Sequence, residues 1–227
     1  MNELLKKVRP QMSDSIITAI FIVLSGGFQD AYTYCARGGV FANAQTGNIV
    51  LMSENLFTGE FSECIRYLVP VLSFLFGTYA AEAIHCKFKT FEKLHWRQII
   101  IVIEILILFA VGFVPQEYNA AANAMVSFVC ALQVQTFHKV RGHVYASTMC
   151  IGNMRSAVES LYAYFHYKDI RIFHKSLVYF SVISIFAVGA GFGRLAVLRF
   201  YERSIWFSCA LLAVSFILML IPSRKES

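Results

Sequence analysis

Residues 37–48 read RGGVFANAQTGN, and about a hundred residues later 141–153 read RGHVYASTMCIGN. The copies stay in register through the aromatic-Ala pair, and the second has one extra residue before its Gly-Asn. Both interrupt stretches that otherwise read as buried in a membrane. Glycine- and amide-rich interruptions at matching positions in two halves of a chain indicate a transport site at a repeat interface. The doubled phrase therefore predicts a repeated fold and the place of its site.

The composition is that of a membrane protein. Hydrophobic residues make up 57% of the chain and charged residues only 15%, whereas a soluble domain carries about a quarter charged residues. Six stretches approach the ~20 residues that cross a hydrocarbon core as a helix. They are 16–34, 67–85, 99–114, 120–137, 177–193 and 205–221. None has the charged face that a helix of a soluble bundle needs, so we expect an all-α polytopic membrane protein in a lipid bilayer.

The net charge of +6 does not indicate nucleic-acid binding. The basic residues lie in loops between apolar stretches, mainly in the N-terminal tail, the loops 86–97 and 166–175, and the C-terminal tail. The loop 57–66 is acidic by contrast. Cytoplasmic loops of membrane proteins carry such an excess of Lys and Arg. We therefore expect a multi-pass protein with both termini in the cytoplasm and no nucleic-acid partner.

The basic loops fall on one side only if the segments 41–56 and 144–163 dip into the membrane and return. This favours six spanning helices plus two re-entrant or broken segments over two further full crossings. An odd number of crossings in each half makes the halves inverted repeats. We place the repeats at about 14–114 and 117–221, within one membrane domain covering 1–227. The sequence does not decide whether the protein forms a homo-oligomer.

The first interruption is a candidate substrate site built from amide, hydroxyl and glycine residues. Its members are Asn43, Gln45, Thr46, Gly47 and Asn48. A half-helix that starts here would direct the partial positive charge of its N-terminus inward, which suits a carboxylate or other small anion. The alternative is a solvent loop followed by an N-capped helix.

The second interruption adds charge to the candidate site. Asn153 matches Asn48, and Arg155 could serve as counter-charge to an anionic substrate. Arg155 and Glu159 are also spaced as an ion pair on one helix face. Gln29 and Gln133 correspond in the two repeats and could line the same cavity, or simply hydrogen-bond between helices.

Two acids lie within apolar helices, Asp30 in the first span and Glu104 in the third. Charged groups at such positions usually face a bundle interior or an ion pathway. We expect Asp30 to bind substrate or couple transport to a proton, and Glu104 to be a second candidate coupling group.

Enzyme, metal and cofactor chemistry have no signal in the sequence. HExxH, GxSxG, P-loop and dinucleotide motifs are missing, and His138 and His143 do not have helical metal-ligand spacing. The six cysteines show no CxxC pair. We expect no catalytic residues, no bound metal and no cofactor.

The stretch GGFQDA at 26–31, followed by GGVF at 38–41 and NAQTGN at 43–48, resembles the YoaK family. These are uncharacterised bacterial inner-membrane proteins with a G-x-x-D-A, then G-G-x-F-x-x-x-x-T-G-N pattern. The resemblance covers nearly the whole chain. It implies location in a bacterial inner membrane and importance for Asp30, Thr46, Gly47 and Asn48, and it implies no activity.

These observations predict a small-solute transporter with a midplane site made by 43–48 and 149–155. Proton coupling and an anionic solute are both open. A passive channel with paired half-helices and a membrane scaffold with no solute path are the alternatives.

Overall fold

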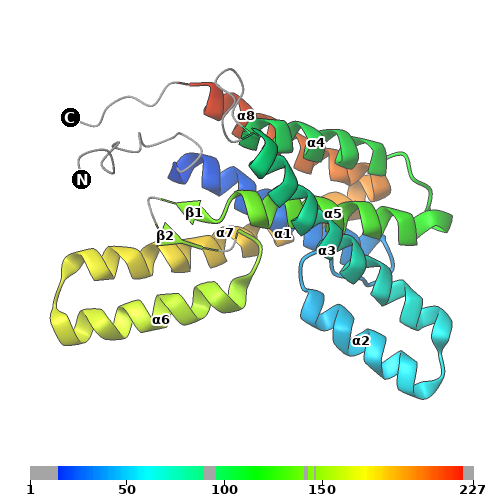
Figure 1. Cartoon of the computed structure of the whole chain (residues 1–227), viewed down its shortest axis with the longest axis horizontal. Coiled ribbons are helices and arrows are strands. Elements are labelled where there is room, and N and C mark those ends of the chain that lie inside the picture. The colour runs from blue at the N-terminus through cyan, green and yellow to red at the C-terminus, as the bar shows by residue number, and fades with distance from the viewer. Residues whose placement is uncertain (1–14, 89–95, 141–142, 146, 222–227) are drawn as a thin grey trace.

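The chain folds into helices joined by short turns, with one two-residue hairpin (Figure 1). The computed structural model describes residues 15–88, 96–140, 143–145 and 147–221. The helices are α1 (Ile16–Ala36), α2 (Gln45–Thr58), α3 (Phe61–Phe88), α4 (Trp96–Val111), α5 (Asn119–Thr136), α6 (Cys150–Tyr167), α7 (Ile170–Phe200) and α8 (Trp206–Leu220). The short 3-10 turns are η2 (Gln116–Tyr118) and η3 (Tyr201–Ile205), and β1 (Lys139–Val140) pairs antiparallel with β2 (His143–Val144).

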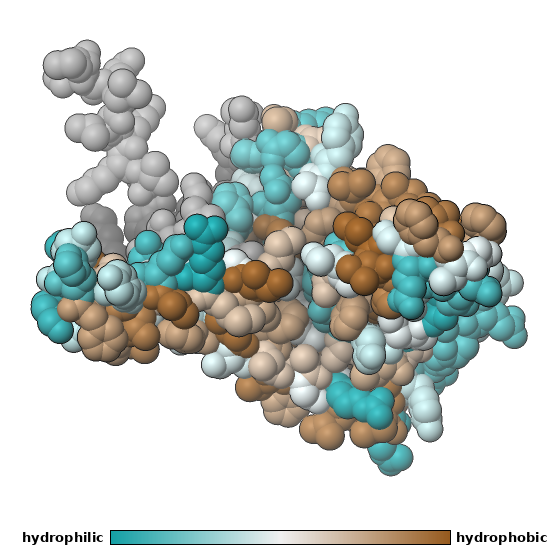
Figure 2. All heavy atoms as spheres, turned by 90° about the horizontal axis from the view of Figure 1, so that it is seen from below, coloured by the Kyte–Doolittle hydropathy of each residue, from teal (hydrophilic) through white to brown (hydrophobic). Residues whose placement is uncertain are grey.

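The six expected spans all coincide with helices, namely α1, α3, α4, α5, α7 and α8. Three continuous helical stretches are long and apolar enough to cross a membrane, namely Ile16–Ala36, Phe61–Phe88 and Ile170–Leu220. Many large apolar side chains on these helices are exposed. Figure 2 shows hydrophobic surface across the middle of one face, with hydrophilic groups mainly toward its left and right ends. The chain is therefore a helical protein suited to a membrane.

Close helix pairs build the centre of the molecule. α1 packs along α7, and α3 packs along α5. A side chain at Gly189 of α7 would collide with the backbone of Leu24 on α1, and a side chain at Gly77 of α3 would come within 2.5 Å of the backbone oxygen of Phe128 on α5. Small residues allow such close approach of helices in membranes.

The end of α1 is fixed by a buried arginine. Arg37 is fully buried and donates to the Tyr32 hydroxyl at 2.8 Å, to the Val111 carbonyl at 3.0 Å and to the Asn119 amide oxygen at 3.2 Å. These contacts gather the ends of α1 and α4 and the start of α5, which we call the Arg37 end. At the opposite end, where α1 begins, Gln98 of α4 donates to the Met219 carbonyl of α8.

Two helical hairpins extend from the centre as separate arms (Figure 1). α2 packs mainly on α3, and α6 packs on α7. The turn between α2 and α3 lies toward the Arg37 end, whereas the turn between α6 and α7 lies at the other end of the molecule (Figure 1). The segments before α2 and α6 return the chain to the middle of α1, where the candidate site lies.

Candidate functional site

The first interruption wraps around the carboxylate of Asp30. Asp30 Oδ1 accepts the backbone N–H of Asn43 at 3.0 Å, and the amides of Ala42 and Ala44 also hydrogen-bond the carboxylate. The side-chain amide of Asn43 donates to the Gly26 carbonyl at 3.2 Å. Because α1 runs from residue 16 to 36, these contacts bring the start of α2 level with the middle of α1. Backbone amides and a helix N-terminus are donors that suit a carboxylate.

Two consecutive glycines allow the chain to turn back. Gly38 and Gly39 have φ of 85° and 78°, a region that side chains rarely adopt. The turn lets residues 40–44 run back along α1 instead of leaving the bundle. The repeat copies differ here, because the second copy has His143 where the first has Gly39. Arg141, Gly142 and Ala146 of the second copy lie outside the described residues.

Gln45 and Asn48 hold the shape of the first interruption. The side chain of Asn48 accepts from the Phe41 N–H at 3.3 Å and donates to the Phe41 carbonyl at 2.7 Å. Gln45 donates to the Ala42 carbonyl at 2.7 Å and accepts from Asn48 at 3.0 Å. Thr46 is exposed on the first turn of α2, and Gly47 lies against the ring of Phe41. In this conformation Gln45 and Asn48 are positioning residues.

The second interruption reaches the same turn of α1 as the first. A Cβ placed on Gly26 would lie 2.6 Å from the Thr148 methyl group and 3.6 Å from the Ser147 carbonyl oxygen. α6 begins two residues later at Cys150, whose thiol is within electrostatic reach of Asp30. Asn153 donates to the Met149 carbonyl at 3.0 Å. The starts of both α2 and α6 therefore approach the segment 26–30.

A buried hydrogen-bond network joins α1, α5 and α8 beside this segment. The Gln29 side-chain amide lies 2.8 Å from the Ser25 hydroxyl, 3.1 Å from the Ser208 hydroxyl and 3.4 Å from the Gln133 side-chain oxygen. The Cys130 thiol donates to the Gln29 oxygen at 3.0 Å. Gln133 donates to the Ile22 carbonyl at 2.8 Å. The two glutamines, expected either to line one cavity or to hydrogen-bond between helices, contact each other directly.

Several polar atoms at the centre are buried without a hydrogen-bond partner. Within the described part of the chain these include Asn43 Oδ1, Ser147 Oγ and Thr148 Oγ1. All three side chains are at most 5% exposed. Buried polar atoms are nearly always hydrogen-bonded, so an unpaired group of them calls for an explanation such as a bound water or solute. They belong to the two interruptions.

Glu104 lies on α4 and is fully buried, and neither carboxylate oxygen accepts a hydrogen bond from the described residues. Its carboxylate is close enough to the Cys130 thiol to interact with it electrostatically, and so is the carboxylate of Asp30. The helix that carries Glu104 packs on α5, which carries Cys130 and Gln133 of the buried network.

Arg155 lies apart from this cluster. Its side chain is 80% exposed, and its guanidinium donates to Glu159 at 2.7 Å on the outer face of α6. This is the helical ion pair that the four-residue spacing allows. The structure brings together Gln29, Asp30, Asn43 and Gln133, and it leaves Arg155 on the surface.

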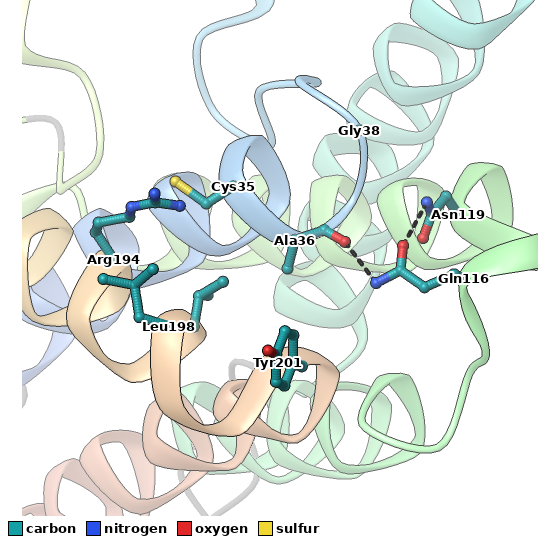
Figure 3. A pocket seen from close by; sticks show the side chains of 9 residues that line it. Cys35, Ala36, Gly38, Gln116, Asn119, Arg194, Leu198 and Tyr201 are labelled. Atoms are coloured by element: carbon teal, nitrogen blue, oxygen red, sulfur yellow. Dashed lines mark hydrogen bonds between the residues drawn. The ribbon is translucent and has the colours of Figure 1, made fainter.

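The described residues hold no cluster of three or more His, Cys, Asp or Glu side chains that could bind a metal. A cavity of about 370 Å³ opens near the Arg37 end between α1, α7 and η3 (Figure 3), and Asp30 is not among the residues that line it. In it the Arg194 side chain points toward Cys35, and Gln116 bridges the Ala36 carbonyl and Asn119 (Figure 3). A hollow of about 360 Å³ lies between the start of α1 and α7 and is largely apolar.

Sequence reasoning missed Ser25, Cys130, Ser147, Thr148 and Ser208. Ser, Thr and Cys are common in membrane helices, so their type alone carries no signal. The spacing of the repeat does carry one: Gln29 and Gln133 are 104 residues apart, and the same spacing relates Asn43 to Ser147.

A family model described as a protein of unknown function (DUF1275) matches residues 18–218. The chain belongs to this family, and the match confirms the predicted resemblance to an uncharacterised family. No curated protein and no solved structure matched the chain.

Proposed function

We propose that this protein is a small-solute transporter of the bacterial inner membrane, with both termini in the cytoplasm. Its site lies where the two interruptions meet the middle of α1. The observation that carries the proposal is the group of unpaired, buried polar atoms on Asn43, Ser147 and Thr148. Non-helical backbone at membrane depth is tolerated where it is buried in protein or lines a water-filled cavity.

Matching helix contacts support two inverted repeats, α1–α4 and α5–α8. Gly189 abuts Leu24, and Gly77 abuts Phe128. Leu24 and Phe128 are 104 residues apart, which is also the separation of the contacting pair Gln29 and Gln133. Equivalent positions of α1 and α5 therefore receive a glycine from α7 and α3 respectively.

The directions of the arms support the inversion. α2 starts near the middle of α1 and leads to a turn toward the Arg37 end, whereas α6 starts at the same depth and leads to the opposite end (Figure 1). Two half-helices that enter from opposite faces and point their N-termini inward are a recurrent way to build a transport site.

The chemistry of the cluster suits a small solute that both donates and accepts hydrogen bonds. Asn43 Oδ1 can only accept, whereas the hydroxyls of Ser147 and Thr148 can do either. An anionic solute would use the amides of 42–44 after displacing the Asp30 carboxylate, which occupies them in this conformation. Release of Asp30 is then one step of solute binding.

A passive channel is the second candidate, because the starts of α2 and α6 approach the same segment of α1. Flux through a channel is independent of a proton or sodium gradient, whereas a coupled transporter accumulates its solute against a concentration gradient.

The test begins with a thermal-shift screen of the purified protein against small anions, carboxylates and nucleobases, followed by flux of the hits into liposomes. We expect Asp30→Asn and Thr148→Val to abolish flux with normal insertion into the membrane. Thr58→Val is the matched control, since Thr58 is exposed at the far end of α2 and, among the described residues, its hydroxyl bonds only to carbonyls of its own helix. Normal flux in both site variants would show that the site is placed wrongly.

A further inference from the structure

Glu104 is the one described acid whose side chain is completely buried, and it stands in the middle of α4. Ile100, Ile101 and Leu108, which lie within four residues of it on the same helix, are also fully buried. Neither carboxylate oxygen has a partner among the described residues. An ionised carboxylate without donors is strongly disfavoured in such surroundings, so the group is expected to hold a proton in this conformation.

The charged and titratable groups around Glu104 do not change this expectation. Cys130 faces it from α5, and from α8 the Cys209 thiol donates to the Ile105 carbonyl. From α3, His85 packs against Trp96 at the start of α4. Arg97, the one cation of α4, has its guanidinium over the Trp96 ring, near that same helix start.

The repeat gives Glu104 a counterpart. Glu104 and Ser208 are separated by the same 104 residues that separate Gln29 from Gln133. Ser208 lies on α8 and bonds to Ser25 and Gln29 of α1. α4 packs on α5 in the first pair, and α8 packs on α1 in the equivalent pair. By this equivalence, Glu104 of α4 corresponds to Ser208 of α8, and Gln133 of α5 corresponds to Gln29 of α1.

The two halves of this arrangement are in different states. The amide of Gln29 has Ser25 and Ser208 as acceptors. The amide of Gln133 instead donates to the Ile22 carbonyl across the repeat interface, and the Glu104 oxygens stay unpaired. In the present conformation the side-chain amide of Gln29 points to Ser208. If the two repeats exchange conformations, the side-chain amide of Gln133 points to Glu104 in the equivalent way.

We infer that Glu104 is the proton-binding residue of the transporter, and that its proton is released when Gln133 turns to donate to it. This rests on the proposed function and its inverted repeats. In the conformation described here Glu104 is neutral and Gln133 is bonded to Ile22. In the opposite-facing conformation the amide of Gln133 stabilises the carboxylate, and the proton leaves to water on the other side. One proton then crosses for each exchange of the two glutamines.

Infrared spectra of the wild type and of variants in lipid bilayers, compared as difference spectra, test the proton site without any solute. We expect the wild-type spectrum at neutral pH to contain a protonated-carboxyl band that is lost in E104Q and kept in E54Q, whose parent Glu54 is exposed on α2. Should E104Q fail to fold, E104D retains a carboxyl group and should shift the band. A wild-type spectrum in which no such band depends on Glu104 overturns the inference.

Gln133→Leu tests whether the side-chain amide of Gln133 turns to donate to Glu104. It removes the amide that would stabilise the carboxylate, so the Glu104 band should persist to higher pH than in the wild type. If the variant and the wild type lose the band at the same pH, Gln133 is not the donor. Because these measurements need no substrate, a Glu104 band in a protein that moves no solute would separate failure of the transport proposal from failure of the proton site.

Discussion

The contact between α1 and α7 gives a prediction that depends only on packing. Gly189→Ala places a methyl group against the carbonyl oxygen, Cα and carbonyl carbon of Leu24. All three are backbone atoms, so the clash is relieved only if the helices separate. Overpacking of this kind costs about 1–3 kcal/mol. Gly191→Ala is the matched control, because a Cβ at Gly191 meets nothing within 4 Å.

The comparison of the two variants isolates the contact. Replacing a helical glycine by alanine contributes up to ~1 kcal/mol in helix propensity, and both variants gain it equally. We therefore expect Gly189→Ala to unfold with a free energy about 1–3 kcal/mol below that of Gly191→Ala, measured by denaturant titration in mixed micelles. Gly77→Ala should behave like Gly189→Ala, because Gly77 abuts Phe128 in the same way. Equal stability of the 189 and 191 variants would refute the close helix contact.

Two further predictions concern the interruptions. In a cysteine-free background, single cysteines at Glu60 and Lys168, the tips of the two arms, should be labelled from opposite sides of the membrane; labelling from one side would exclude entry from opposite faces. Asn48→Ala should lower the free energy of unfolding by about 1–3 kcal/mol relative to Asn55→Ala, because it leaves the N–H and carbonyl of Phe41 unpaired. Asn55 bonds only to the Leu51 carbonyl of its own helix, and equal stability of the two variants would mean that Asn48 does not hold the first interruption.

The helices were predictable because hydrophobic length is a strong signal. α1, α4, α5 and α8 each begin and end within about three residues of the expected spans. The largest difference is α7, which extends seven residues beyond the expected 177–193 at each end. Its extra turns carry Arg171 and Arg199, whose side chains are exposed. A search for apolar stretches ends before such charged residues, although the helix itself continues through them.

The partners of the polar residues were not predictable, because they come from elements far apart in the sequence. Asp30 was expected to bind substrate or couple transport to a proton, and in the structure its carboxylate bonds to the backbone amides of 42–44. Arg37 is turned away from it toward Tyr32, Val111 and Asn119. Backbone amides have no signature in the sequence, since every residue except proline carries one. The positive φ of Gly38 and Gly39, which lets the chain turn back toward Asp30, is likewise known only from the structure.

The two buried acids differ in a way that suggests different roles. The carboxylate of Asp30 accepts hydrogen bonds from the backbone amides of 42–44, and these bonds tie the first interruption to α1. Glu104 has no such donors among the described residues, and the serine at the equivalent position in the other repeat carries no charge. A residue that must take up and release a proton needs an environment that changes between two conformations, whereas a residue that anchors the site needs donors that hold it until a solute displaces it. On this reasoning Asp30 anchors the site and Glu104 couples it to the proton, so a nearly symmetric frame of helices contains a site whose two halves are chemically unequal.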